Sequence, residues 1–363
     1  MHDEKLQQVE LSLLPGIGPV TVRQLISYCG SACGVFGTSE ARLGSIPGIG
    51  KKTAHTISAG RDQALARDQL KMAAAFQASI HFFTDESYPH RLKQLEDGPV
   101  LLFTRGRPAY DRQYTIGIVG TRRPTPYAIS VIRKILNELY HYRPTVISGL
   151  AYGVDIAAHL EALKLGLPTI GVMGSGLDHF YPNAHKNIAE RMVDQGGLVT
   201  ELRFGCKPEM YHFPSRNRII AGLSDVLLVV EARKKGGALI TAAYGNAYGK
   251  ACFAVPGAID APASAGCNQL IKLQKARMMT CVEDIVEPLR WSKNPVNIST
   301  FLQGTPEARI LEVLGNFPEG VHIDRLSRKT QIPINKMGVY LLNLEVRGQI
   351  KTAPGHKFLL VRK

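Results

Sequence analysis

The pattern of apolar and polar positions changes along the chain and separates a central segment from two flanking ones. Between residues 115 and 280, short runs rich in Val, Ile and Leu alternate with stretches whose apolar residues recur at helical spacing. Helices fit, for example, over Val154–Leu165, Ala184–Asp194 and Ala238–Ala247. This alternation predicts an α/β fold with a doubly wound, Rossmann-like parallel sheet, which binds ligands at the carboxyl ends of its strands. The predicted strands are Thr115–Val119, Thr145–Ser148, Thr169–Met173, Leu198–Glu201, Val226–Glu231, Cys252–Val255 and Arg277–Thr280.

Residues 1–75 contain a short internal repeat, in which Leu14-Pro15-Gly16-Ile17-Gly18 recurs as Ile46-Pro47-Gly48-Ile49-Gly50. Helical spacing follows each copy, so the segment resembles the SAM-like helix-hairpin-helix motif of DNA-repair proteins. In such a turn, the glycines let the backbone approach a phosphate, and the next helix offers unpaired N–H groups. A hairpin that serves structure alone is the alternative. The candidate DNA contacts of the second copy are Gly48, Gly50, Lys51 and Lys52.

The carboxyl-terminal segment predicts a winged-helix domain over residues 305–363. Helical spacing at Ile310–Leu314, Val321–Thr330 and Ile334–Val346 precedes two short strands, Ile350–Thr352 and Phe358–Val361, which can pair as a hairpin. Winged helices bind either DNA or protein. Pro and Gly in residues 291–304 indicate a linker. The predicted domains are therefore 1–75, 76–290 and 305–363.

Charge and composition narrow the range of partners. The chain has 44 Lys and Arg against 30 Asp and Glu, a net charge of +14, which favours a nucleic acid over a membrane because no basic amphipathic anchor stands out. Its first residues carry no apolar signal-peptide core, and its apolar runs are far too short to span a bilayer. The six cysteines form no C-x-x-C pair. We therefore expect a cytoplasmic protein with reduced thiols, no metal and no cofactor.

Small and basic residues gather at several predicted strand ends. Such residues at a strand-to-helix turn let backbone N–H groups surround an anion. No complete G-x-G-x-x-G or Walker A sequence is present, so each turn taken alone could be an ordinary one. Together, on one edge of one sheet, they predict an extended phosphate-binding face. Its candidate residues are Gly120, Thr121 and Arg122, then Gly149, and then Lys235, Gly237 and Thr241.

The segment from Phe213 to Asp225 carries the most specific chemistry. We expect Ser215 to cap a helix whose first turn holds Arg216, Asn217 and Arg218. Cations at a helix amino terminus oppose its dipole unless an anion binds there, so both arginines are candidates for phosphate contact. Phe213 could stack on a base, as aromatic residues do in sequence-tolerant single-strand binders. Asn217 is expected to brace the neighbouring loops as well.

Residues 78–288 resemble the DNA-processing protein A family (DprA or Smf), and the two flanking segments match the fuller architecture of that family. The resemblance implies a homodimer, without enzymatic activity, that binds incoming single-stranded DNA in natural transformation, protects it and helps load the RecA recombinase. It also implies a binding pocket formed by these residues: Thr121, Arg122, Gly149, Phe213, Arg216, Arg218 and the turn 237–241. The matching motifs are Asp85-x-x-Tyr88-Pro89, Val119-Gly120-Thr121-Arg122, Ser148-Gly149-x-Ala151-x-Gly153-x-Asp155, Gly174-x-Gly176-x-Asp178, Gly237-x-Leu239-Ile240-Thr241, Val255-Pro256-Gly257 and Gly266-Cys267-Asn268.

This sequence departs from the family in places. Tyr152 stands where many relatives have Arg, Met210 stands where Lys is frequent, and Gly236-Gly237 replaces a Ser-containing turn. For the dimer contact we expect the apolar residues Leu270-Ile271 and Met278-Met279.

Two enzyme classes are the main alternatives. A nucleotide-binding or nucleoside-monophosphate-cleaving enzyme of the related phosphoribohydrolase fold would carry Pro-Gly-Gly-x-Gly-Thr and a catalytic Glu. The turn at Gly236–Ala243 has neither the later glycine nor a carboxylate, which leaves Asp155 and Asp178 as candidates for acid–base chemistry. A dinucleotide oxidoreductase lacks support because the first loop has no third-glycine spacing and carries two arginines.

Overall fold

The computed structural model describes residues 2–293, 306–317, 319–346 and 349–361. Residues 1–293 form one compact unit and residues 294–363 form a second. Residues 294–304 of the predicted linker lie outside the described residues, whereas Trp291 is buried in the first unit and stacks on Tyr114, with ring centroids 4.5 Å apart. The domain boundary expected at residue 75 stays a prediction. No helix in the described ranges has both the length and the apolar character to cross a bilayer.

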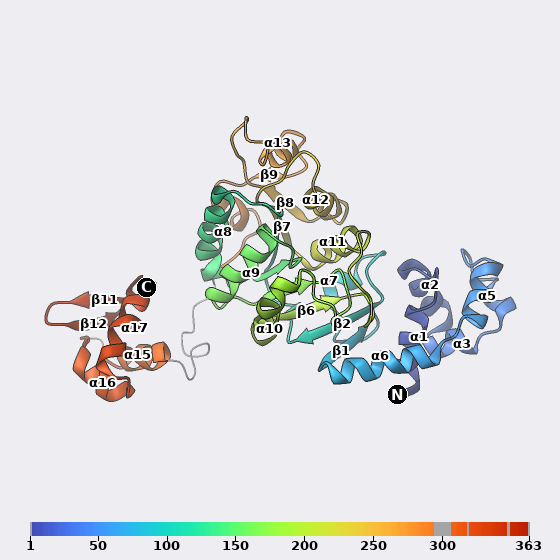
Figure 1. The fold of residues 1–363 in the computed structure, drawn as a ribbon, viewed down its shortest axis with the longest axis horizontal. Coiled ribbons are helices and arrows are strands. Elements are labelled where there is room, and N and C mark those ends of the chain that lie inside the picture. The colour runs from blue at the N-terminus through green and yellow to red at the C-terminus, as the bar shows by residue number, and fades with distance from the viewer. Residues whose placement is uncertain (1, 294–305, 318, 347–348, 362–363) are drawn as a thin grey trace. The chain divides into compact units, whose positions relative to one another are not determined.

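A nine-stranded sheet forms the centre of the first unit (Figure 1). Seven neighbouring strands are parallel, which confirms the predicted doubly wound α/β fold. The pattern missed two strands, β1 and β2, which pair antiparallel with each other. Strand β2 also pairs antiparallel with β6. In spatial order the strands are β1 (Ala78–Phe82), β2 (Leu101–Gly106), β6 (Gly197–Thr200), β5 (Thr169–Val172), β4 (Thr145–Ser148), β3 (Thr115–Val119), β7 (Val226–Val229), β8 (Ala251–Ala254) and β9 (Arg277–Met278).

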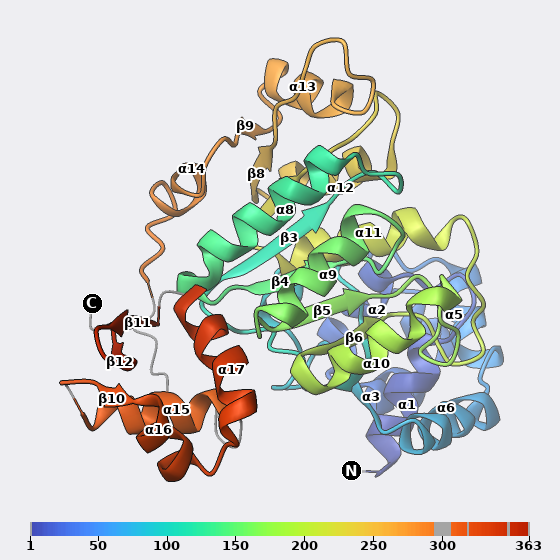
Figure 2. The same cartoon turned by 60° about the vertical axis from the view of Figure 1, so that its left-hand side comes forward.

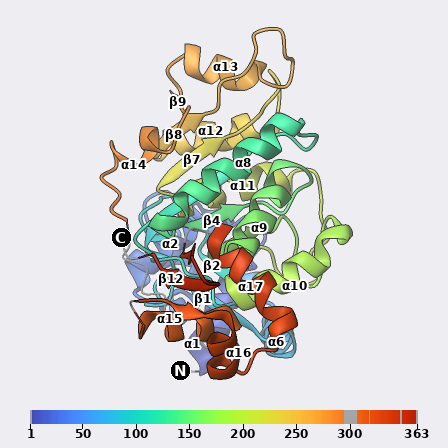
Figure 3. The ribbon, with the colours of Figure 1, turned by 90° about the vertical axis from the view of Figure 1, so that its left-hand side faces the viewer.

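Helices cover both faces of the sheet because successive residues of each strand point to opposite sides. In β7, Val226 and Leu228 pack in one apolar cluster with α8, whereas Leu227 and Val229 pack in another with α11 and α12. Figures 2 and 3 show α8, α9 and α10 following one another across the first face. The bounds are α8 (Pro126–Leu139), α9 (Val154–Lys164) and α10 (Lys186–Gln195) on that face, and α11 (His212–Leu223), α12 (Gly237–Ala247) and α13 (Ala265–Lys272) on the other.

The strand order contains one reversal, and the reversal locates the binding region. The chain builds outward from β3 through β4 and β5 to β6, then returns along α11 to place β7 on the other side of β3. Loops that leave β3 and β7 therefore diverge to opposite faces of the sheet and leave a crevice between them. Such a switch point, at the carboxyl ends of the strands, is where open α/β sheets bind ligands.

The amino-terminal helices form the predicted tandem helix-hairpin-helix and pack on the edge of the sheet. Their core is continuous with that of β1 and β2, and the side chain of Gln69 holds the backbone of Phe204 by accepting from its N–H at 2.7 Å and donating to its carbonyl at 3.5 Å. Gly16 and Gly48 have φ values of 72° and 78°, which favour glycine. The helices are α1 (His2–Ser12), α2 (Pro19–Cys29), α3 (Ala32–Gly37), α4 (Glu40–Leu43), α5 (Lys51–Ala59) and α6 (Gln63–Ala75).

The second unit is a winged helix, as predicted, with one local difference. Val321 and His322 were expected at the start of a helix but form a short strand, β10, because they pair with Phe358 and Lys357. The helix then begins at Ile323. The described elements are α15 (Pro306–Gly315), α16 (Ile323–Thr330), α17 (Ile334–Val346), β11 (Ile350–Ala353) and β12 (Lys357–Leu360).

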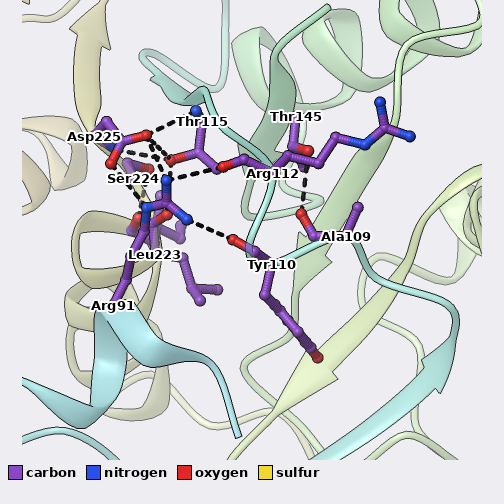
Figure 4. A network of polar contacts seen from close by, with 10 residues as sticks. Arg91, Ala109, Tyr110, Arg112, Thr115, Thr145, Leu223, Ser224 and Asp225 are labelled. Carbon is purple, nitrogen blue, oxygen red and sulfur yellow. Dashed lines mark hydrogen bonds and ion pairs between the residues drawn. The ribbon is translucent and has the colours of Figure 1, made fainter. Parts of the chain in front are cut away.

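A bidentate ion pair joins the short helix α7 (His90–Lys93) to the turn before β7 (Figure 4). Arg91 donates to both carboxylate oxygens of Asp225 at 2.8 Å, and also to the carbonyls of Tyr110 and Arg112. The Asp225 carboxylate also accepts the N–H and hydroxyl of Thr115 at 3.0 Å. This network fixes the first residue of β3 against the turn that leads into β7, so it sets the pairing of the two strands that flank the crevice.

Replacing Arg91 with Ala should lower the free energy of unfolding by about 2–3 kcal/mol, because it leaves a partly buried carboxylate and two carbonyls without their donor. Urea unfolding followed by circular dichroism measures the change. Arg112→Ala is the control: Arg112 contributes only its carbonyl to the network, and its side chain points away in Figure 4. Arg112→Ala should lower the free energy of unfolding by no more than about 0.5 kcal/mol. Equal losses for the two variants would show that the Arg91 side chain does not hold the network together.

Candidate nucleic-acid interface

A cleft of about 590 Å³ opens at the switch point between the carboxyl ends of β3 and β7. Five separate segments line it: the loop after β3, the start of α9, the loop after β5 that holds Tyr181, the segment around the first turns of α11, and the loop that leads into α12. Gly149 lies in a small adjoining pocket that shares Arg122, Phe213 and Arg216 with the cleft. The structure thus brings together these residues selected from the sequence: Gly120, Thr121, Arg122, Phe213, Arg216, Asn217, Lys235, Gly237 and Thr241.

The loop after β3 follows a path that requires glycine at position 120. A Cβ on Gly120 would lie 2.6 Å from Val154 Cγ2 and 2.9 Å from the Glu231 carbonyl oxygen. Thr121 then donates its N–H to that same carbonyl at 2.7 Å and accepts from the Val154 N–H at 3.1 Å. Three segments are therefore tied together at one point, which leaves the next residue, Arg122, exposed at the mouth of the cleft.

Arg216 forms the floor of the cleft and is 5% exposed. Its guanidinium donates to the carbonyl of Val172 at 2.8 Å and fills the space beside Gly149, where a Cβ would lie 1.7 Å from Nη1. Burial lowers the pKa of Arg216 to about 10, so the group stays charged at neutral pH. Its Nε has no hydrogen-bond partner within the described part of the chain. A buried cation with unused donors, bordering an open cleft, is suited to an anion.

Asp155 supports this floor, because its carboxylate lies near Arg216 and is hydrogen-bonded to the backbone. Its carboxylate accepts the Gly149 N–H at 3.2 Å, so this candidate for acid–base chemistry holds the backbone that follows β4. Burial raises the pKa of Asp155, and the Arg216 cation acts in the opposite direction. His159, on the same helix, is fully buried against the Thr169 hydroxyl at 2.7 Å, and burial lowers its pKa to about 3. His159 does not line the cleft, whereas Asp155 borders it with its carboxylate already engaged.

Aromatic rings form one wall of the cleft. Phe213 and Tyr181 lie with ring centroids 5.4 Å apart, and Tyr181 is 47% exposed. The Arg122 guanidinium lies 5.5 Å from the centroid of the Phe213 ring, within cation–π range. A flat apolar surface with a cation beside it can hold a nucleobase and its phosphate together.

The amino terminus of α12, which begins at Gly237 after an extended Gly236, also lines the cleft. No side chain caps this helix, so its first N–H groups remain available to an anion. Asn217 braces the turn by donating to the Gly237 carbonyl at 3.4 Å, and the Thr241 hydroxyl donates to the same carbonyl, also at 3.4 Å. Lys235 is exposed just before the helix.

Two expectations for α11 need correction because the helix begins at His212 rather than after Ser215. The Ser215 hydroxyl donates back to the His212 carbonyl at 3.0 Å and caps nothing. Arg218 does not line the cleft: it forms an ion pair with Glu201 and donates to the Asp97 carbonyl at 2.7 Å. The helical period explains the difference, because positions 213, 216, 217 and 220 share one face of α11 whereas position 218 lies on another.

The sequence reasoning missed Arg233, which also lines the cleft. Arg233 follows β7 in the same basic run as Lys235, and this position after a predicted strand was the available signal. The cleft cations are Arg122, Arg216, Arg233 and Lys235 against the single carboxylate of Asp155, so its formal charge is 4 − 1 = +3.

The helix-hairpin-helix candidates lie outside this cleft. Gly50 precedes α5 in an extended conformation without a side-chain cap, and Lys51 and Lys52 are exposed in the first turn. Their DNA contact stays a prediction. In the described ranges, no group of His, Cys, Asp and Glu residues is arranged to hold a metal ion.

Comparison with known proteins decides the family. The sequence profile described as DNA recombination-mediator protein A matches residues 79–290, which hold the sheet and the cleft. The chain belongs to the DNA recombination-mediator protein A family. Two further profiles match its flanking parts: a SAM-like helix-hairpin-helix tandem over residues 9–60 and the DprA winged helix domain over residues 303–356.

Relatives of this family cover most of the chain. The DNA processing protein DprA of Bacillus subtilis is 35% identical over 248 residues, 62% of this chain and 83% of that protein. Protein Smf of Synechocystis is 34% identical over 276 residues, 74% of this chain and 69% of that protein.

Solved structures agree with the family. DprA from Streptococcus pneumoniae aligns with a TM-score of 0.67 at 29% identity, over 77% of this chain and 95% of that one. A structure of DprA from Helicobacter pylori, described by its single-stranded DNA binding mode, aligns with a TM-score of 0.54 at 29% identity, over 59% of this chain and 96% of that one.

Two glycines of the cleft should respond differently to substitution. Gly120→Ala should lower the free energy of unfolding by about 1–3 kcal/mol, because the methyl group would overlap Val154 and the Glu231 backbone. At Gly237 nothing lies within 4 Å of an added Cβ, so Gly237→Ala should change stability by less than about 0.5 kcal/mol. Thermal and urea unfolding of both variants measure the costs; a Gly120→Ala protein as stable as wild type would show that the loops do not meet as described.

Proposed function

We propose that this protein binds single-stranded DNA in the cleft at the switch point and performs no catalysis on it. The observation that carries the proposal is the combination, in one cleft, of the buried Arg216 cation, the uncapped start of α12 and the Phe213–Tyr181 wall. Phosphate would contact the first two, and bases would stack on the third. The single-stranded DNA binding mode described for the Helicobacter pylori relative supports the same ligand.

The absence of catalysis is proposed from the chemistry of the cleft walls. Asp155, the carboxylate that lines the cleft, is tied to the Gly149 backbone and lies beside Arg216. A general acid or base must reach the proton that it transfers, and this carboxylate is only 7% exposed and already accepts the Gly149 N–H. The phosphoribohydrolase alternative would need a second carboxylate near Thr241, where the chain has alanines.

The cellular role follows from the family. The named relatives are DNA processing proteins, so we propose that this protein protects incoming single strands in the cytoplasm and helps load the RecA recombinase during natural transformation. A mediator of this kind must hold DNA without sequence preference and release it to the recombinase. A cleft that contacts phosphates and base faces rather than base edges meets the first requirement.

We also propose a homodimer formed at the β9 end of the sheet. Of the apolar residues expected there, Leu270 and Met279 are buried in the core, whereas Met278 is 53% exposed. Leu273 and Ile259, near the same sheet edge in sequence and fold, are exposed as well. Joining two clefts in one particle raises the effective concentration of the second site for the same strand, which can multiply avidity about 10²-fold.

The wild-type protein should bind an oligothymidylate more tightly than a duplex of the same length, and the affinity should fall steeply with salt. Four cleft cations predict a slope of log K against log salt of about −3 for a single strand. Fluorescence anisotropy over a salt series measures both quantities. A flat salt response, a preference for duplex, or release of base or phosphate from DNA or from nucleoside monophosphates would contradict the proposal.

Arg122→Glu should weaken oligothymidylate binding by at least about tenfold, because it places a carboxylate beside the proposed base and phosphate. Arg216→Glu would be a poorer test, since it buries an unpaired carboxylate and threatens the fold. Lys134→Glu, an equal charge change at an exposed residue of α8 outside the cleft, should stay within about twofold of wild type. A well-folded Arg122→Glu protein with wild-type affinity would remove this residue from the interface.

Met278→Glu should convert a dimer into monomers and weaken the binding of long strands by at least about tenfold, while the affinity for short oligonucleotides stays unchanged. Multi-angle light scattering and anisotropy measure the two effects. A wild-type protein that is monomeric at tens of micromolar and still binds long strands tightly would show that the dimer proposal is wrong.

A further inference from the structure

A second groove, distinct from the cleft, runs across the face of the sheet covered by α8, α9 and α10. It has a volume of about 950 Å³ and begins at the loop after β3. Figures 2 and 3 show these helices side by side on this face. Its floor is apolar and is formed by Ile129, Ile132, Ile156 and Leu160.

The rim of this groove is strongly cationic. It carries Arg122 and Arg123 from the loop, Arg133 from α8, Lys164 from α9 and Arg191 from α10. One carboxylate, Glu161, opposes them, so the formal charge of the groove is 5 − 1 = +4.

The rim cations are mostly unneutralised. Glu161 is already engaged by Lys164 at 3.2 Å and by the Asn137 amide at 3.2 Å. In the described part of the chain, neither Arg133 nor Arg191 forms an ion pair with a carboxylate, and both are exposed. Arginines held around an apolar floor without carboxylate partners repel one another, and a polyanion would relieve that repulsion.

The groove is continuous with the cleft. Arg122 lines both, and Tyr152 lines both the groove and the small pocket that contains Gly149. Tyr152 is 49% exposed, and its ring is held edge-on by His185, with centroids 4.9 Å apart. An exposed ring in a fixed orientation at the junction offers a stacking surface between the two binding regions.

We propose that a single strand leaving the cleft past Arg122 and Tyr152 continues along this groove, with its phosphates on the rim cations and its bases on the apolar floor. The inference rests on the proposed function, since it extends the same ligand beyond the cleft. The charge would also suit an acidic protein, but the shared junction residues favour the strand that the cleft already holds. An apolar floor between two cationic rims fits separated bases and a backbone better than it fits a duplex, whose bases are stacked inside.

The experiment compares oligothymidylates of about 4 to 16 nucleotides, the range of site sizes seen in single-strand binders. Wild-type affinity should rise with length beyond the strand that fills the cleft. Arg133→Glu should abolish much of this gain in affinity with length. It should weaken binding of the longest strand by about fivefold or more, and binding of the shortest strand by less than about twofold. Arg191→Glu, on a different helix, should give the same length-dependent loss.

Lys134→Glu is the matched control, because it makes the same charge change one residue along α8 at an exposed position that does not line the groove. It should follow the wild-type length series. For the longest strand, the slope of log K against log salt should fall by about 0.7 for each phosphate contact removed, in the Arg133 and Arg191 variants and not in the control.

The outcomes separate this inference from the function on which it rests. If the wild type fails to bind even the shortest strand, the cleft proposal fails. If it binds short strands and the Arg133 and Arg191 variants match it at every length, the groove inference is overturned. The inference is equally overturned if these variants keep full affinity for the longest strand but show a lower molar mass than the wild type in light scattering. The groove would then hold a second copy of the chain.

Discussion

The cleft depends on one buried cation. Arg216 has lost nearly all contact with water, and the hydrogen bond to Val172 and the nearby Asp155 carboxylate offset only part of that cost. The space for its guanidinium exists because position 149 carries no side chain. Fixing Arg216 also fixes the rotation of α11, and the helical period then places Phe213 at the mouth of the cleft and Asn217 against the start of α12.

Carboxylate partners distinguish structural arginines from those available to a ligand. Arg91 is neutralised by Asp225 and Arg218 by Glu201, and each fixes one piece of chain against another. Arg122 and Arg133 form no such pair in the described ranges and border open cavities. The net charge of +14 is therefore not spread evenly as solubilising charge. Part of it is concentrated where two binding regions meet at Arg122.

The topology of the sheet explains why the charges meet there. The return of the chain from β6 to β7 brings the loop after β3 beside the loop after β7, although more than a hundred residues separate them in sequence. The same reversal sends α8 and α9 to one face and α11 and α12 to the other. The cleft lies between these two layers, and the groove follows the first of them away from it.

The sequence by itself determined the parallel strands, because strands buried on both faces are continuous runs of Val, Ile and Leu, such as Val226–Val229. It also located the glycine-rich turns, since close approach and anion binding both demand small residues there. Only the tertiary structure decided which individual side chains face the cleft and which pack inside the fold. Arg216 and Arg218 look alike in sequence, but the packing of α11 turns one toward the cleft and the other toward Glu201. The antiparallel pairing of β2 with β6 and the apolar groove likewise arise from contacts between segments distant in sequence, which no local pattern encodes.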